Sequence, residues 1–171
     1  MRMKFTYDSV FAWPLERIVP LLAHEELVDF EDLPNVNARK VIERRREGNK
    51  TYKVYEWDVH GKIPKPAQMI IRQGMLAFTE YTVWDDDTCV FDIRIEPHHL
   101  KNVFNVTTSS TWSAVSETET KRHIETAVEV NIPVVGPLLE RTVLEHIRRN
   151  TEKATEVMRR ALAARLDTQT A

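Results

Sequence analysis

The sequence contains six histidines, the residues best suited to bind a metal, but their spacing does not favour a metal site. His98 and His99 are adjacent, so on a strand their side chains would point to opposite faces. No two histidines are four residues apart, which is the spacing of a helical zinc site. The single cysteine, Cys89, allows neither an internal disulfide nor a multi-cysteine metal site. We therefore predict no metal site and no cofactor.

Two runs of like charge are each typical of a hairpin turn. Residues 85–87 are three aspartates, which are common in turns, and the run lacks the spacing and the glycine of an EF-hand calcium loop. Residues 44–46 are three arginines flanked by Glu43 and Glu47, which favours a solvated hairpin tip. The alternative is a patch for nucleic acid or an anionic membrane. Because the formal net charge is only −2, we expect no nucleic-acid partner.

Acid–base catalysis would require paired ionisable groups with shifted pKa values. Glu56, Asp58 and Glu80 lie in strand-like segments and could point inward, but nothing in the sequence pairs them with a nucleophile. The chain also lacks a nucleophile elbow, a phosphate-binding glycine loop and a dinucleotide fingerprint. We therefore name no catalytic residue, and an enzymatic activity is the less favoured interpretation.

The hydrophobic pattern divides the chain into helical and strand-like segments. The predicted elements are a strand at 3–10, two short helices within 15–32 that are separated at Pro20, hairpins at 36–59, 76–97 and 103–132, and an amphipathic helix at about 134–166. We expect residues 1–166 to form one domain and residues 167–171 to be a disordered tail.

This order of elements predicts an α+β fold, in which a seven-stranded antiparallel sheet curls around the long C-terminal helix. The alternation of side chains along each strand indicates which of them face that helix. The expected inward residues include Tyr55, Trp57 and Val59, then Phe91, Ile93 and Ile95, then Phe104, Val106, Thr108, Ser110 and Trp112, and finally Ile124, Thr126, Val128, Val130 and Ile132. A curled sheet leaves space beside the helix, and that space is a candidate ligand cavity.

The segment 59–74, "VHGKIPKPAQMIIRQG", is too long to be a simple turn between two antiparallel strands. Its two prolines would stiffen the chain, its Met69, Ile70 and Ile71 could cover an apolar ligand or touch a membrane, and its cations could meet a phosphate headgroup. The alternative is a short covering element that closes one edge of the core and binds nothing.

Three stretches carry a resemblance to a known superfamily. They are "MKFTYDSVFAWPLERIV" at the start, "EWDVHGKIPKPAQMII" after the third strand, and "VVGPLLERTVLEHIRRNTEKATEVM" at the end. In order and spacing they resemble the START-like (helix-grip, SRPBCC) superfamily, and more narrowly the PRELI-like lipid-transfer proteins and bacterial uncharacterised START-like proteins. The resemblance covers nearly the whole chain. It implies the helix-grip fold, a ligand that is a hydrophobic molecule or a lipid, and a loop over the cavity mouth within segment 59–74.

We therefore expect this chain to bind, and to transfer, a hydrophobic small molecule or lipid, with transient membrane contact. The alternatives are a cyclase or aromatase type of enzyme on the same fold and a protein-interaction module without a cavity. The predicted ligand-binding residues are Tyr55, Trp57, Met69, Ile70, Phe91, Ile93, Thr108, Ser110, Trp112, Thr126, Val128, Leu138, Leu139 and Thr142, and the predicted headgroup residues are Lys62, Lys65 and Arg72. The N-terminal residues lack the apolar stretch of a signal peptide and no run is apolar enough to span a membrane, so we expect a cytoplasmic protein. The oligomeric state is left open.

Overall fold

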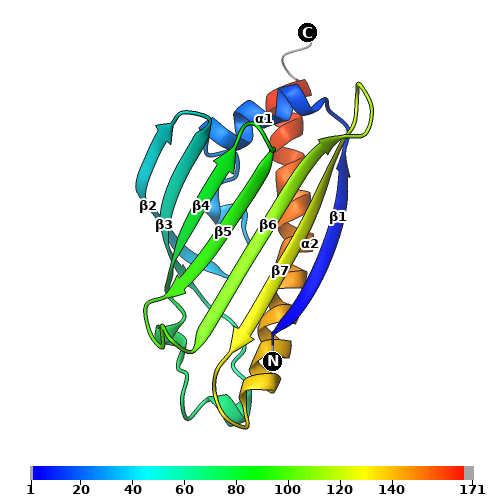
Figure 1. The fold of residues 1–171 in the computed structure, drawn as a ribbon. Helices are drawn as coiled ribbons and strands as arrows, with labels where there is room; N and C mark the ends of the chain where they lie inside the picture. The colour runs from blue at the N-terminus through cyan, green and yellow to red at the C-terminus, as the bar shows by residue number, and fades with distance from the viewer. Residues whose placement is uncertain (1, 168–171) are drawn as a thin grey trace.

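The computed structural model describes residues 2–167 (Figure 1). Its elements, in chain order, are β1 (Met3–Phe11), α1 (Leu15–His24), the 3-10 helix η1 (Phe30–Asp32), β2 (Val36–Glu47), β3 (Lys50–Val59), the 3-10 helices η2 (Lys65–Ala67) and η3 (Gln73–Met75), β4 (Phe78–Asp85), β5 (Val90–Pro97), β6 (Phe104–Ala114), β7 (Thr120–Val130) and α2 (Gly136–Leu166). Of the predicted C-terminal tail, residues 168–171 lie outside the described residues.

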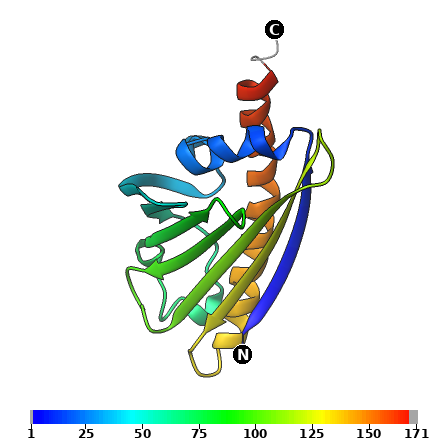
Figure 2. The same ribbon diagram turned by 45° about the horizontal axis from the view of Figure 1, so that its top comes forward.

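The seven strands form one antiparallel sheet in the order β1-β7-β6-β5-β4-β3-β2, which confirms the predicted fold class. The three hairpins form as predicted, and the first turns at Gly48, whose φ of +59° is a conformation that glycine adopts without strain. The sheet curls, and α2 packs along β7 and β1 (Figure 2). The strands β2 to β4 lie to one side of α2 in both views. The inner face of β3 to β5 is therefore covered less directly than that of β7.

Two helical segments follow β1 as predicted, but they do not separate at Pro20. The helix α1 continues through Pro20 and ends at His24, and the short helix η1 follows. A proline inside a helix leaves the carbonyl group four residues earlier without its donor. That carbonyl belongs to Glu16, and both Glu16 and Pro20 are exposed, so water can reach this side of the helix. The solvent-facing position explains why the proline does not end α1.

A buried lysine fixes the end of α1 to the sheet. Lys53 lies on the inner face of β3 with 5% of its surface exposed, and its Nζ donates to the carbonyl oxygens of Leu22, at 3.3 Å, and Glu25, at 3.0 Å. A cation at a helix C-terminus satisfies carbonyl groups that have no partner within the helix and complements the helix dipole. Desolvation lowers the pKa of Lys53.

The corner between β7 and α2 explains the "VVGPLLE" part of the C-terminal motif. A Cβ atom at Gly136 would lie 2.6 Å from the carbonyl oxygen of Val130, so only glycine fits there without a shift of backbone. Four residues later, the buried Glu140 accepts a hydrogen bond from the backbone N–H of Val130 at 3.0 Å. Both contacts hold the start of α2 against the end of β7.

The interior contains two packed apolar clusters at opposite ends of the sheet. One lies beside α1 and includes Phe11, Ile18, Trp84, Trp112 and Leu162. The other includes Ala67, Ile71, Val106, Val128, Val130 and Leu139. Neither cluster includes Tyr55, Trp57, Ile93 or Thr108, although all four side chains lie on the inner face. The middle of the inner face, over β3 to β6, thus contains side chains that belong to neither packed cluster.

Candidate functional site

The middle of the inner face consists of two neighbouring rows of cross-strand residues. Starting from β3, the first row is Tyr55, Glu80, Ile95, Val106 and Val128, and the second row is Lys53, Thr82, Ile93, Thr108 and Thr126. Glu80, Ile93, Ile95 and Thr108 are only partly buried, whereas Val128 and Thr126 under α2 are fully buried. The part of the rows on β4 to β6 is therefore the part that a ligand could contact, and we call it the central inner face.

The central inner face combines the apolar side chains Ile93, Ile95 and Val106 with the polar side chains Glu80, Thr82 and Thr108. Thr108 and Thr126 share a hydrogen bond between their hydroxyl groups at 2.9 Å. On β3 and β4, the rings of Trp57 and Phe78 stack with their centroids 6.2 Å apart. Ligand sites usually combine apolar walls with polar groups that orient the ligand.

Glu80 is the ionisable group of the central inner face. It is half-buried, and its Oε1 accepts a long hydrogen bond, 3.4 Å, from the hydroxyl group of Thr82. Desolvation raises the pKa of Glu80 to about 7, against the lowering effects of Thr82, Arg39 and Trp57. The Nε1 of Trp57 is buried and lies near this carboxyl group without forming a hydrogen bond of good geometry. Glu80 can therefore be protonated or ionised at neutral pH.

A second carboxylate, Glu26, stands at the α1 side of the central inner face and is fully engaged. It accepts hydrogen bonds from the hydroxyl group of Tyr55, at 2.8 and 3.0 Å, forms an ion pair with Arg39 at 3.7 Å, and accepts a hydrogen bond from Arg44. The guanidinium group of Arg39 lies over the rings of Tyr55 and Trp57, 5.5 and 5.4 Å from their centroids. Burial and Glu26 together raise the pKa of Tyr55, so its hydroxyl group stays neutral.

Some of the predicted ligand-binding residues come together and others do not. Ile93 and Thr108 lie on the central inner face, and Tyr55, Trp57 and Thr126 adjoin it from β3 and β7. The remainder lie elsewhere: Trp112 in the cluster beside α1 with Phe91 against it, Ser110 buried one row beyond, and Val128 and Leu139 in the other cluster.

Four predicted residues lie apart from these because they are on the outer parts of their segments. Met69 is 92% exposed, Ile70 is 41% exposed and Leu138 is 40% exposed, whereas Thr142 is half-buried and its hydroxyl group donates to the carbonyl oxygen of Leu138. Periodicity places Leu139 and Val143, rather than Leu138, on the buried side of α2. These four residues do not line the central inner face.

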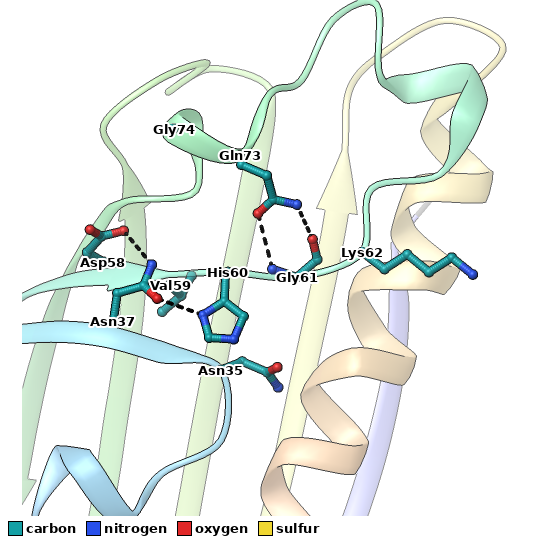
Figure 3. Close-up of a pocket in the computed structure, with 9 residues that line it drawn as sticks. All are labelled: Asn35, Asn37, Asp58, Val59, His60, Gly61, Lys62, Gln73 and Gly74. Atoms are coloured by element: carbon teal, nitrogen blue, oxygen red, sulfur yellow. Dashed lines mark hydrogen bonds between the residues drawn. The ribbon is translucent and has the colours of Figure 1, made fainter.

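Segment 59–74 has a buried side and an exposed side, and Ile71, which was expected to cover a ligand or touch a membrane, lies on the buried side. Ala67 and Ile71 pack into the second cluster, so the segment closes that end of the core. Met69 and Ile70 point outward instead. The side chain of Gln73 pairs with both backbone groups of Gly61, accepting from its N–H at 3.4 Å and donating to its carbonyl oxygen (Figure 3). This pair joins the two ends of the segment.

A polar cleft of about 680 Å³ lies where segment 59–74 meets the start of β2 (Figure 3). Its lining residues are Asn35, Asn37, Asp58, Val59, His60, Gly61, Lys62, Gln73 and Gly74. His60 and Asn37 form a hydrogen bond of 2.7 Å between ring Nδ1 and Oδ1, and Asn37 donates to Asp58 at 3.3 Å. The polar groups on this wall are thus already bonded to one another.

A second cleft, of about 500 Å³, is formed by segment 59–74 alone, and it brings together the three predicted headgroup residues. Its lining residues are Lys62, Ile63, Pro64, Lys65, Gln68, Ile71, Arg72 and Gln73. Lys62, Lys65 and Arg72 supply three positive charges, and this lining contains no acidic residue. The mixture of cations with apolar side chains suits an anionic group attached to an apolar body. We call this site the cationic cleft.

Within residues 2–167, no group of three or more His, Cys, Asp or Glu side chains is arranged to hold a metal ion. In the same part of the chain, no helix is both long enough and apolar enough to cross a membrane.

The sequence did not identify the charged residues around the central inner face. Glu80 was considered together with Glu56 and Asp58, but the latter two are exposed on the outer face of β3. The pattern along β4 does not show which face is buried, because Tyr81 and Val83 on the outer face are as apolar as residues that face a core. The register of the β3–β4 pair, which sets Glu80 opposite Tyr55, is the signal that distinguishes the faces.

Comparisons with known proteins place this geometry in a family and a fold. A family model described as "Protein of unknown function (DUF2505)" matches residues 6–162. A search of curated proteins finds no match.

Several solved structures share the fold. The TTHA0849 protein of Thermus thermophilus is 19% identical with a TM-score of 0.67, over 96% of this chain and 99% of that one. The Zhui aromatase/cyclase from Streptomyces sp. R1128 is 14% identical with a TM-score of 0.68, over 95% of each chain. Norcoclaurine synthase from Thalictrum flavum, in complex with dopamine and hydroxybenzaldehyde, is 10% identical with a TM-score of 0.64, over 96% of this chain and 88% of that one. These similarities confirm the predicted START-like helix-grip fold, while the narrower resemblance to PRELI-like proteins stays a prediction.

Proposed function

Because this chain belongs to the family described as "Protein of unknown function (DUF2505)" and has the helix-grip fold, we propose that it binds a hydrophobic small molecule or lipid at the central inner face. The proposal rests on the part of the inner face that lies between the two packed clusters. There Ile93 and Thr108 face inward yet keep part of their surface exposed. A ligand that covered these side chains would gain about 25 cal/mol for each Å² of apolar surface removed from water.

Native mass spectrometry of the protein as purified, followed by organic extraction, tests this proposal. We expect a species heavier than the calculated chain mass, with a lipid or other apolar molecule in the extract. A clean unliganded mass, together with no binding across a panel of phospholipids, fatty acids and aromatic compounds, would rule the proposal out.

The cationic cleft supports a more specific version of the proposed function, in which segment 59–74 binds an anionic headgroup or an anionic membrane surface. Lys65 and Arg72 are exposed and belong to the same segment as the exposed Met69 and Ile70, the apolar side chains that would enter the lipid layer. Each basic residue near an anionic surface contributes about 1 kcal/mol to binding. Delivery of a ligand to the membrane would then require this segment to move, as the lids of other proteins do.

Vesicle co-sedimentation tests the membrane contact. We expect binding to vesicles of phosphatidylcholine with phosphatidylglycerol to exceed binding to phosphatidylcholine alone. The double variant Lys65→Gln, Arg72→Gln should lower the affinity roughly tenfold or more, because two charges at about 1 kcal/mol each are lost. Lys50→Gln, at the exposed β2–β3 turn, is the matched control. Equal binding by both variants and the wild type would contradict this assignment.

Glu80 favours a second candidate function, an enzyme of the cyclase or aromatase type on this fold. A carboxyl group with a pKa of about 7 is suited to general acid–base catalysis near neutral pH, and Tyr55 provides a hydroxyl group across the strand pair. Conversion of an extracted ligand by the wild type, but not by Glu80→Gln, would support this candidate. Return of the ligand unchanged would favour binding alone.

A further inference from the structure

Glu80 is the ionisable side chain that a ligand at the central inner face would meet. Its cross-strand neighbours are Tyr55 on β3 and Ile95 on β5, so it lies inside the sheet rather than at an edge. Among residues 2–167 it forms no ion pair within 4 Å, and Thr82 donates its hydrogen bond at 3.4 Å. A half-buried carboxyl group that has one long hydrogen bond and no ion pair is available to a further hydrogen-bond partner.

The charged groups around Glu80 are already bonded to other partners. On β2, Arg39 pairs with Glu26 and lies over two aromatic rings. On β3, Lys53 donates to the end of α1, and the hydroxyl group of Tyr55 is held by Glu26. On this side of Glu80, the positive charges of Arg39 and Lys53 therefore outnumber the single negative charge of Glu26. An amine ligand would add another cation beside them, which is unfavourable.

We infer that protonated Glu80 anchors the ligand by donating a hydrogen bond to a carbonyl oxygen of the ligand. The aromatic wall formed by Tyr55, Trp57 and Phe78 suits a flat body, so the ligand class is an oxygenated aromatic or alicyclic molecule rather than a plain acyl chain. This inference rests on the proposed function and specifies its ligand class.

The assignment couples ligand binding to a proton. Burial raises the pKa of Glu80 to about 7 in the free protein, and a ligand that displaces water from it would raise that pKa further. Binding should therefore take up protons between pH 7 and pH 8. If only the protonated form anchors the ligand, the affinity should fall roughly fivefold from pH 7 to pH 8, because the protonated fraction of a group with a pKa of about 7 falls from about one half to about one tenth.

The experiment uses 2-acetylnaphthalene, which is flat, carries one carbonyl group and has no ionisable group. Its binding to the full-length protein is measured by titration calorimetry between pH 6 and pH 8. At pH 7.5 the titration is repeated in phosphate and in Tris, whose ionisation enthalpies differ. We expect the observed enthalpy to differ between the two buffers by an amount that reports proton uptake, and the affinity to fall as the pH rises.

Glu80→Gln should bind 2-acetylnaphthalene with the same affinity and the same enthalpy in both buffers, because the amide cannot titrate. Glu56→Gln, which changes a carboxylate on the exposed face of the neighbouring strand, should behave like the wild type. The buffer comparison on the wild type requires no variant, so it decides the question even if Glu80→Gln does not fold.

The outcomes separate this inference from the proposed function. Binding of 2-acetylnaphthalene with an affinity and enthalpy independent of pH and buffer would overturn the role of Glu80 alone. Proton release on binding would overturn it as well, since that is the response expected for a cationic partner. Failure to bind 2-acetylnaphthalene, combined with a clean mass and no lipid binding, would overturn the proposed function and this inference together.

Discussion

At the scale of single residues, the inner face contains ionisable groups whose surroundings differ sharply. Glu80 and Glu26 both lie near Tyr55, yet Glu26 has two arginines and a tyrosine as partners while Glu80 has a threonine. The consequence is that Glu26 holds a local network together, whereas Glu80 remains titratable near neutral pH. Residues that destabilise the free protein in this way are common at functional sites.

Glu80→Gln should stabilise the unliganded protein at high pH and not at low pH. A carboxyl group whose pKa is raised from 4.5 to about 7 by folding opposes folding once it ionises. The loss of stability begins as the pH rises above 4.5 and is complete above about 7. The variant should gain roughly 1–3 kcal/mol in unfolding free energy at pH 8 and almost nothing at pH 4, as measured by urea denaturation. A gain that is equal at both pH values would contradict this prediction.

At the scale of elements, two polar or backbone contacts set how the helices meet the sheet. Lys53 connects β3 to the C-terminal end of α1, and Gly136 allows α2 to start close against the end of β7. Each contact depends on a single residue, because other lysines and glycines of the chain have different surroundings. Each therefore offers a matched pair of substitutions.

Lys53→Met should destabilise the protein by about 1–3 kcal/mol. The substitution keeps the apolar part of the side chain but leaves the carbonyl groups of Leu22 and Glu25 without a buried donor. Lys50→Met, on the same strand but exposed, should change the stability by less than about 0.5 kcal/mol. Thermal unfolding followed by circular dichroism measures both, and equal effects at the two positions would argue against the capping role.

Gly136→Ala should destabilise the protein by about 2 kcal/mol or more. Its methyl group would lie 2.6 Å from the carbonyl oxygen of Val130, so the backbone must move at the corner that leads into α2. Gly74→Ala is the control, since no atom lies within 4 Å of the equivalent position and its φ is not in the left-handed region. Chemical denaturation of both variants provides the comparison. A Gly136→Ala variant as stable as Gly74→Ala would show that the corner adjusts without cost.

At the scale of the whole molecule, the arrangement is a sheet that is packed at both ends and less closely covered in the middle. The helix α2 follows β7 and β1, while segment 59–74 closes the end opposite α1. This arrangement links the central inner face to the cationic cleft through one continuous segment of chain. A ligand with an apolar body and a polar end is therefore the kind of molecule that fits the proposed function.

Much of this fold was predictable because its signals are local. The turn at Gly48, the alternation along β7 and the apolar spacing along α2 specify three elements and their buried sides without any tertiary information. The site was less predictable. Tyr55, Trp57, Ile93 and Thr108 were placed on the correct face, but the alternation does not show that Trp112 and Val128 are packed tight.

The sequence by itself determined the seven strands, their hairpin order and the long final helix, since each depends on residues that are neighbours in the chain. Only the tertiary structure decided which inner positions are filled and which stay open, that Ile71 turns inward while Met69 faces outward, and that Glu80 rather than Glu56 lies on the inner face of the sheet. The physical reason is that burial and the pKa shift it causes depend on side chains brought from distant strands. No single segment contains that information.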